Sequence, residues 1–194
     1  MARPLSEEKR HALLEAAAQA VATEGLTATT ARISRLAGVA EGTLFTYFEN
    51  KEQLFNELYL HLKAGLRESM VDGFPGDSAD REQVRHAWDG YLAWGLAHPH
   101  GQRALQQLLV SDRIGPEHRA AGAQGFDQLD ALLKSRLAAA RGASPAVAPE
   151  FAGALFMSIA QTVMDAIARQ PEAAEAYRER GFQAFWAALN AGGD

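Results

Sequence analysis

Apolar residues recur along this sequence at the spacing of an α-helix, and Gly, Pro, Asn or Ser separates one such stretch from the next. We find no stretch with the alternating pattern of a strand followed by turn residues. A helix with one apolar face must bury that face against another element. The pattern therefore predicts an all-α fold of about nine helices without a sheet.

Several helix boundaries follow from residues that favour helix ends. Ser6 can cap the first helix, with Glu7 and Glu8 at the positive end of its dipole. Asn50 can cap the fourth helix, with Gln53 at its third position. The predicted helices cover residues 6–25, 30–38, 41–47, 50–73, 79–97, 101–110, 116–141, 149–169 and 171–191, with a linker at 142–148.

Composition excludes several classes of protein. The chain has 194 residues, of which 47% are hydrophobic and 22% charged, and this balance is typical of a globular protein. It has no cysteine, which excludes disulfides, thiolate metal sites and cysteine nucleophiles. No apolar run reaches the ~18–20 residues of a membrane-spanning helix, and the first ten residues lack the apolar core of a signal peptide. We therefore expect a cytoplasmic protein that has no membrane partner.

The overall charge gives no reason to expect a nucleic-acid partner. The net charge is −5, whereas a phosphate-binding surface normally has clustered Lys and Arg. The first 51 residues carry six basic and six acidic side chains, so the excess of acid lies in the rest of the chain. Any argument for DNA binding must therefore come from local geometry.

The turn Gly-Val-Ala at residues 38–40 joins two short predicted helices. A glycine at the start of such a turn, followed by an apolar residue, is typical of a helix-turn-helix. In the helix after the turn, Leu44 and Phe48 lie ~40° apart on one face, because each residue turns an α-helix by ~100°. The opposite face carries Thr43, Thr46 and Tyr47. One face is therefore predicted to pack inward and the other to face outward.

Two further positions can contact phosphate. Gly42 leaves bare backbone near the start of the third helix, where free N–H groups and the helix dipole favour an anion. Lys51 follows the same helix and can neutralise a second phosphate. Short turns of this kind also occur in enzymes, so the residues alone leave a purely structural helix-turn-helix as an alternative.

The run from Thr29 to Leu54, TTARISRLAGVAEGTLFTYFENKEQL, resembles the DNA-binding signature of the tetracycline-repressor (TetR) family. That signature often has an Ile-Ala pair, an Ala-Gly-Val, a Gly-Thr-Leu-Tyr and a Phe-x-x-Lys-Glu-x-Leu. Here Ile33-Ser34, Ala37-Gly38-Val39, Gly42-Thr43-Leu44-Phe45 and the run from Phe48 to Leu54 follow it in order without a gap. The resemblance covers roughly residues 6–60, and beyond them only the length and the helical character agree with the family.

The resemblance implies that residues of the second and third helices contact double-stranded DNA. Thr29 and Thr30 would cap the second helix and contact phosphate, and Lys51 would bind phosphate. The outward residues of the third helix would enter the major groove or flank it. The complete predicted set is Thr29, Thr30, Glu41, Gly42, Thr43, Phe45, Thr46, Tyr47 and Lys51.

Three positions depart from the residues that the family usually has. Ala40 stands where many members have Ser or Thr, so the third helix loses its side-chain cap. Phe45 replaces the commoner Tyr, which removes a hydroxyl that could reach phosphate. Glu41 places a carboxylate beside DNA, where it either accepts from a cytosine amino group or faces solvent near the positive end of the helix dipole.

A recognition helix of about two turns reaches one half-site, so specific binding usually needs two copies on a two-fold axis, ~34–36 Å apart. We therefore expect a homodimer. Its predicted interface lies in the last two helices, which have more apolar residues than one core needs: Gly153, Phe156, Val163, Ile167, Phe182, Phe185, Trp186 and Leu189. In the family this helix pair typically forms a four-helix dimer bundle; the alternative is that both helices only cover their own core.

Large or adaptable apolar residues in the second half of the chain can line a ligand pocket, although they also occur in ordinary cores. Gln161 and Asp165 lie one turn apart in a largely apolar helix, where an unpaired buried carboxylate is unfavourable. They either pair across the dimer, face water or meet a ligand. The predicted set is Trp88, Tyr91, Trp94, Phe126, Met157, Gln161 and Asp165, and it favours a hydrophobic or aromatic small molecule.

Metal and catalytic sites are not predicted. His98 and His100 flank a proline without a third ligand nearby, and they are better explained as the end of the preceding helix. The other histidines are scattered, and no grouping of serine, histidine and acid stands out. We therefore expect no metal, no cofactor and no enzymatic activity.

Together these patterns predict a helix-turn-helix domain at residues 1–50 and a ligand-binding and dimerisation domain at 51–194, with the helix at 51–72 as connector. The resemblance implies a ligand-responsive transcriptional regulator, more specifically a repressor that binds a palindromic operator. A ligand in the second domain would move the connector, change the separation of the two recognition helices and release the DNA. The alternatives are an all-α enzyme or small-molecule carrier, and an adaptor whose exposed faces bind another protein.

Overall fold

The computed structural model describes residues 6–139 and 149–190, and the chain forms two compact units. The first unit contains Met1–Gly65 and Ala97–Gln124, and the second contains Leu66–Leu96 and Gly125–Asp194. Each unit therefore combines segments that are distant in the sequence. The first unit is larger than the predicted domain of residues 1–50, because it also includes residues 51–65 and 97–124.

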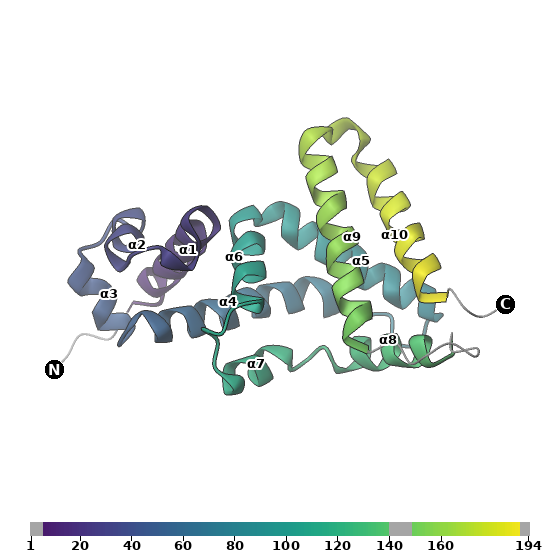
Figure 1. Ribbon diagram of the computed structural model, residues 1–194, viewed down its shortest axis with the longest axis horizontal. Helices are drawn as coiled ribbons and strands as arrows, with labels where there is room; N and C mark the ends of the chain where they lie inside the picture. The colour runs from purple at the N-terminus through teal and green to yellow at the C-terminus, as the bar shows by residue number, and fades with distance from the viewer. Residues whose placement is uncertain (1–5, 140–148, 191–194) are drawn as a thin grey trace. The chain divides into compact units, whose positions relative to one another are not determined.

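All regular elements in the described part of the chain are helices, which confirms the predicted fold class. Figure 1 shows α1 (Glu7–Glu24), α2 (Thr30–Leu36), α3 (Glu41–Tyr47), α4 (Lys51–Val71), α5 (Asp80–Ala97), α6 (Pro99–Leu109), α7 (Pro116–Ala123), α8 (Asp127–Ala139), α9 (Pro149–Arg169) and α10 (Ala174–Asn190). Two short 3-10 helices, η1 (Gly25–Thr27) and η2 (Pro171–Ala173), follow α1 and α9.

Helix α1 begins and ends where the sequence predicts. The Ser6 hydroxyl oxygen accepts from the backbone N–H of Lys9, 3.4 Å away. Gly25 ends the helix with a φ of +73°, which glycine adopts without strain. The predicted apolar stripe of Leu13, Leu14, Ala17 and Val21 is buried. Helix α1 lies against α2 and α6 in the first unit (Figure 1), so this stripe contributes to the core of that unit.

Trp88 of α5 lies in the core of the second unit. Its ring is stacked on that of Phe185, with centroids 6.3 Å apart, and meets Phe156 edge-on at 5.5 Å. The indole N–H donates to the carbonyl oxygen of Arg178 at 3.2 Å, which satisfies its only polar group. Helices α9 and α10, which run side by side in Figure 1, supply all three partners.

The single helix predicted at 116–141 is wrong, because this segment forms two helices, α7 and α8. Gln124 leaves α7 with an extended backbone (φ −59°, ψ 139°), and Gly125 has a φ of +84°. These angles interrupt the helical hydrogen bonds, and glycine adopts the second value readily. The predicted apolar stripe begins at Phe126, after the break, so its periodicity does not show where the preceding helix ends. Residues 140 and 141 lie outside the described residues.

Two other predicted boundaries change at prolines. Pro99 occupies the first turn of α6 after His98 in the N-cap position, so His98 and His100 begin α6 rather than end α5. At Pro171 the chain first forms η2 and only then α10. Proline fits both places because the first turn of a helix leaves its N–H groups without helical partners. The predicted linker at 142–148 and the end of the last helix at 191 lie outside the described residues.

Candidate nucleic-acid interface

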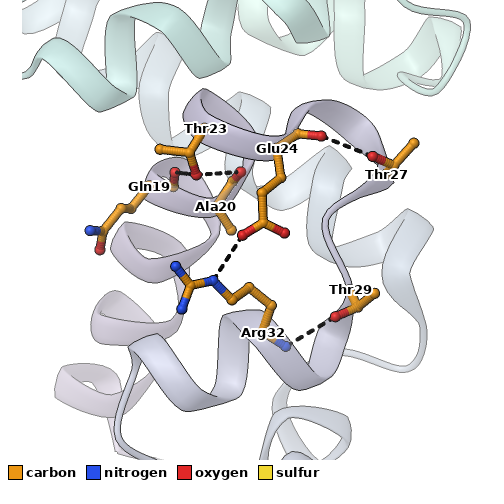
Figure 2. A network of polar contacts seen from close by, with 7 residues as sticks. All are labelled: Gln19, Ala20, Thr23, Glu24, Thr27, Thr29 and Arg32. Atoms are coloured by element: carbon orange, nitrogen blue, oxygen red, sulfur yellow. Dashed lines mark hydrogen bonds and ion pairs between the residues drawn. The ribbon is translucent and has the colours of Figure 1, made fainter.

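Threonine side chains hold the end of α1 and the short helix η1 (Figure 2). The Thr23 hydroxyl donates to the carbonyl oxygens of Gln19 at 2.9 Å and Ala20 at 3.1 Å. The Thr27 hydroxyl donates to the carbonyl oxygen of Glu24 at 2.8 Å. These local bonds fix the point from which the chain enters α2.

Arg32 connects α2 to the end of α1 through hydrogen bonds. Its Nε donates to Oε1 of Glu24 at 2.8 Å, and its backbone N–H donates to Oγ1 of Thr29 at 3.1 Å (Figure 2). Thr29 thus caps α2, as the sequence predicts. The pair of Arg32 and Glu24 is at the surface, where such pairs contribute about 0–1 kcal/mol, so it orients α2 more than it stabilises the fold.

Gly38 makes the turn between α2 and α3 with a φ of +69°. Its N–H donates to the carbonyl oxygen of Arg35 at 3.2 Å, and the N–H of Val39 donates to that of Ser34 at 3.0 Å. A left-handed residue with these bonds is a common helix end that favours glycine. The chain therefore changes direction within residues 38–40 and enters α3 at once, which is the geometry of a helix-turn-helix.

Helix α3 buries the face that the spacing predicts, whereas of the three residues predicted to face outward Thr46 is exposed and Thr43 and Tyr47 are half-buried. Leu44 and Phe48 are completely buried. Gly42, Phe45 and Thr46 are exposed, and Thr43 is half-buried. Phe45 keeps 48% of its surface exposed, which is high for a large apolar ring. The exposed face of α3 is therefore largely uncharged and carries one accessible aromatic ring.

Thr30 and Glu41 bond to each other at the start of this face. The Thr30 hydroxyl donates to Oε1 of Glu41 at 2.6 Å and so links the first turns of α2 and α3. Thr29 alone caps α2, so Thr30 is not a second cap. Ala40 gives α3 no side-chain cap, as expected. Glu41 is exposed in the first turn of α3, as in the solvent-facing alternative, and its bond to Thr30 is an additional contact that the sequence does not predict.

Tyr47 is half-buried, and its hydroxyl has an internal partner. The backbone N–H of Ser6 donates to the Tyr47 hydroxyl oxygen at 3.1 Å. The bond holds the start of α1 to the end of α3, although the two residues are far apart in the sequence. Tyr47 therefore fixes the position of α3, and only part of its ring is left for the groove that it is predicted to flank.

Lys51, at the start of α4, is held inside the first unit. Its ammonium donates to the carbonyl oxygen of Leu26 at 2.9 Å and lies 5.1 Å from the ring centroid of Phe55. Burial, and to a lesser degree the charge of Arg113, lowers the pKa of Lys51 from its ordinary value. An ammonium has three donors, so a phosphate can share it with Leu26. The predicted phosphate contact is compatible with this position.

The residues predicted to bind a ligand fall into two groups. Trp88, Tyr91, Trp94 and Phe126 are buried, and Met157 is half-buried. On α9, Gln161 is half-buried and Asp165 is exposed, and the Gln161 amide donates to Oδ1 of Asp165 at 2.8 Å. Because the Asp165 carboxylate is exposed, it is not the unpaired buried charge that suggested a ligand. We therefore remove Asp165 from the pocket.

Most side chains predicted to form the dimer interface lie in the core of the second unit. Six of them are buried within a single chain: Phe156, Val163, Ile167, Phe182, Phe185 and Leu189. The rings of Phe156 and Phe185, for example, meet edge-on at 5.1 Å. Buried side chains offer almost no surface to a second copy, so an interface here must use other residues. Gly153 and Trp186 are half-buried and keep some accessible surface.

Helix α9 also has an exposed apolar side. Phe151 keeps 56% of its surface exposed, and only 33% of the apolar stretch Phe151–Arg169 is buried. This stretch has a mean hydropathy of 1.5 and is long and apolar enough to cross a membrane. No other helix within residues 6–139 and 149–190 meets both conditions. A single such helix is a weak indication, because a core or interface helix of a soluble protein passes the same test.

One group of side chains is not evident from the sequence, in which its histidines are scattered. His11 and Glu15 on α1 lie beside His61 on α4, all within the first unit. The spacing of His11 and Glu15, one helical turn apart, is a signal that the sequence contains. The place of His61 depends on how α4 packs, which the sequence does not reveal.

Comparison with known proteins gives a match for the N-terminal region. Residues 13–58 match the family model described as bacterial regulatory proteins of the tetR family. The uncharacterised HTH-type transcriptional regulator YhgD of Bacillus subtilis is 30% identical over 95 residues, which are 48% of this chain and 50% of that protein. The matched part thus spans about half the length of this curated relative.

Solved structures are similar over almost the whole chain. A protein of Shewanella sp. PV-4 that is assigned to the TetR family is 26% identical, with a TM-score of 0.75, and the match covers 93% of this chain and 97% of that one. The TetR-like regulator LfrR of Mycobacterium smegmatis, solved in complex with proflavine, is 21% identical, with a TM-score of 0.66 and coverage of 96% and 97%. The part of the chain that the structure describes therefore has the fold of a helix-turn-helix region followed by a C-terminal helical domain.

Proposed function

Because the chain belongs to the TetR family of bacterial regulatory proteins, we propose that this transcription regulator is a repressor that binds a palindromic operator as a homodimer and leaves it when a small molecule binds. The observation that carries the proposal is the division of α3, where Leu44 is completely buried while Gly42 and Thr46 are exposed. A short helix held by its apolar side can enter a major groove with its other side.

We assign the DNA contacts by the chemistry that each exposed group offers. Thr43 and Thr46 supply hydroxyls for base edges, and the ring of Phe45 can contact a thymine methyl group or a sugar. Thr29, at the cap of α2, and Lys51, at the start of α4, lie at helix starts that suit phosphate. The phosphate contacts position the protein, and α3 reads the sequence.

For the dimer we propose the exposed face of α9 and α10. On α9 the exposed positions Ala154, Ser158 and Thr162 follow one another at intervals of four residues and have small side chains. The hydroxyls of Ser158 and Thr162 donate to carbonyl oxygens of their own helix, at 2.8 and 2.9 Å. This stripe therefore has few unsatisfied polar groups and permits close approach of a second helix. On α10, Ala184, Ala187 and Ala188 continue the exposed small surface.

For the ligand we propose a hydrophobic or aromatic small molecule bound in the second unit. The support is the aromatic character of this unit, including Trp88, Tyr91 and Trp94, and the proflavine complex of the similar regulator LfrR. Helix α4 has residues in both units, so it can carry a change from one to the other. The ligand releases DNA only if it binds more tightly to the conformation that does not fit the operator.

Selection of bound fragments from random duplex DNA tests the proposal. We expect a palindromic consensus whose half-site centres lie ~34–36 Å apart, and an affinity that falls steeply with salt because phosphate contacts release counterions. A protein that binds no duplex would overturn the DNA-binding proposal and favour a carrier, an enzyme or an adaptor. A consensus without two-fold symmetry would overturn the homodimer while leaving DNA binding in place.

A further inference from the structure

His11, Glu15 and His61 bring three metal-binding atoms to one place on the first unit. Nε2 of His61 lies 3.1 Å from Oε1 of Glu15, and Nε2 of His11 lies 4.0 Å from the same oxygen. All three ligand atoms are within 4.8 Å of one another. The group connects two helices, because His11 and Glu15 belong to α1 and His61 belongs to α4.

The distances fit a small divalent ion after a modest change. Ligand atoms that bind a tetrahedral ion at ~2.0–2.1 Å lie ~3.3 Å from one another. The pair of His61 and Glu15 is already near this separation, at 3.1 Å. From the limit of 4.8 Å that holds for the group, the separations between the ligand atom of His11 and the other two need to shorten by about 1.5 Å at most. His11 is exposed, so a rotamer change can supply this movement.

A hydrogen bond explains only part of the arrangement. The bond between His61 and Glu15 needs no metal. Nε2 of His11, however, is too far from Glu15 for a hydrogen bond, and its ring meets that of His61 at a centroid distance of 5.1 Å with an interplanar angle of 81°. Helical spacing places His11 beside Glu15, and the bond between His61 and Glu15 brings the third ligand group to the same place.

The basic residue next to the group in the sequence has its own acidic partner. Arg10 precedes His11, but its guanidinium is paired with Glu57, which lies on α4 one turn before His61. Glu15 supplies a negative charge at the group itself. His11 and Glu15 are exposed and His61 is half-buried, so an ion has an entry path from solvent.

Two imidazoles and one carboxylate form a ligand set that zinc-type ions prefer, and three protein ligands leave a fourth position for water. We propose that His11, Glu15 and His61 bind one divalent transition-metal ion of the zinc type, and that this ion fastens α1 to α4. No metal is expected from the sequence, because the sequence does not reveal that His61 lies beside α1. The site does not depend on the proposed function, so each can fail without the other.

Titration of the tag-free full chain with Zn²⁺ in a calorimeter tests this site, and Co²⁺ serves as a visible probe of coordination. We expect one ion per chain and the absorption bands of tetrahedral Co²⁺. Loss of an outer-shell partner weakens metal binding by about 10–100-fold, so loss of a direct ligand in His11→Gln, Glu15→Gln or His61→Gln should weaken it by about 100-fold or more. At a Zn²⁺ concentration one hundred times Kd, the thermal midpoint should rise by about 5–10 °C, and a chelator should reverse the rise.

Two matched variants control for exposed side chains elsewhere in the same unit. Glu52→Gln makes the same change as Glu15→Gln at the start of α4, nine residues before His61, and His100→Gln places the same substitution as His11→Gln on α6. Both should bind Zn²⁺ like the unaltered protein. Circular dichroism of each variant without metal checks that the helices are intact.

Three results would overturn the site. The first is equal Zn²⁺ affinity in the unaltered chain and in a variant with both His11→Gln and His61→Gln. The second is a loss of affinity in Glu52→Gln or His100→Gln as large as that in the ligand variants. The third is weaker binding in Glu15→Gln and His61→Gln with no change in His11→Gln, which would leave two ligands and refute the three-ligand site.

Discussion

Replacing Gly90 with alanine should push α4 and α5 apart inside the second unit. A Cβ at Gly90 would lie 2.1 Å from the carbonyl oxygen of Ser69 and 2.9 Å from Cα of Met70. Both neighbours are backbone atoms, so no side chain can rotate out of the way. The Ser69 hydroxyl also donates to the carbonyl oxygen of Gly90 at 2.9 Å, which holds the helices together at this point.

The expected loss of stability is the sum of three effects. Real Cβ atoms essentially never lie closer than 3.0 Å to such neighbours, so the helices must separate by most of an ångström. Overpacking of this kind costs about 1–3 kcal/mol, and a contact with rigid backbone belongs at the upper end. The weakened bond from Ser69 adds about 0.5–1.5 kcal/mol, whereas alanine favours the helix by about 0.8–1.0 kcal/mol over glycine. We expect a net loss of about 2–3 kcal/mol.

Tryptophan fluorescence can follow this unit by itself. The chain has three tryptophans, and all of them, Trp88, Trp94 and Trp186, belong to the second unit. In urea, a loss of this size should lower the unfolding midpoint by about 1–2 M, since m is about 1–3 kcal/mol/M for small proteins. Protein concentration must stay constant, because a dimer makes apparent stability depend on it.

Gly153→Ala on α9 is the matched control. A Cβ at Gly153 meets no atom within 4 Å, so this change should only favour the helix, by about 0.5–1 kcal/mol. The two variants should therefore shift the midpoint in opposite directions. A midpoint for Gly90→Ala at or above that of the unaltered chain would refute the close approach of α4 and α5.

Four further changes test the first unit and the dimer. Asn50→Ala removes the oxygen that accepts from the N–H of Gln53 at 2.8 Å, so thermal unfolding should show a loss of about 1 kcal/mol, and an unchanged midpoint would contradict the cap. Thr43→Ala should relax operator preference in a selection experiment, whereas Ser135→Ala, which removes a hydroxyl from the exposed surface of α8, should not; equal effects would contradict base reading by α3. Lys51→Ala should weaken all duplexes alike and reduce the salt slope by about 0.9 for each phosphate that the ammonium neutralises, and an unchanged slope would remove Lys51 from the interface. Ala184→Glu should convert a dimer to monomers in analytical ultracentrifugation while Ala12→Glu on α1 should not; a dimer that survives Ala184→Glu would exclude this face of α10.

The first unit was largely predictable because its signals are local. The burial of Leu44 and Phe48 follows from their spacing of four residues on α3. The caps at Ser6, Thr29 and Asn50 follow from side chains that bond to backbone three residues ahead. Such signals lie within one turn of helix, so the sequence contains all the information they need.

The interface residues of the second unit were not predictable in the same way. Helical spacing indicates that Phe156, Phe182 and Phe185 are buried, but it does not say whether their own chain or a second copy covers them. In the structure, the ring of Trp88 on α5 contacts the rings of all three. These phenylalanines lie about 70 to 100 positions after Trp88 in the sequence. The exposed small residues of α9 remain for a partner, and small side chains carry little hydrophobic signal in a sequence.

Hydrogen bonds between polar groups far apart in the sequence could also not be predicted from helical spacing. Nothing in the sequence pairs the hydroxyl of Tyr47 with the N–H of Ser6, or the ammonium of Lys51 with the carbonyl oxygen of Leu26. Each pairing depends on how the helices pack, and packing is set by side chains that are not part of the pair. Residue types on an exposed face therefore predict possible DNA contacts, but not the internal bonds that these groups already make.

Those internal bonds limit how tightly one copy can bind DNA. Arg32 is paired with Glu24, Lys51 with a carbonyl oxygen and Thr30 with Glu41. A phosphate that takes over Arg32 or Thr30 exchanges one bond for another, and such an exchange contributes little net free energy, whereas Lys51 has further donors that a phosphate can use. A half-site bound mainly through the uncharged face of α3 should thus be weak. Two weak half-sites joined in one dimer bind tightly only if their spacing matches the operator, because the second then binds at a high effective concentration. A ligand that changes this spacing needs to disturb neither α3 nor its contacts to release the DNA.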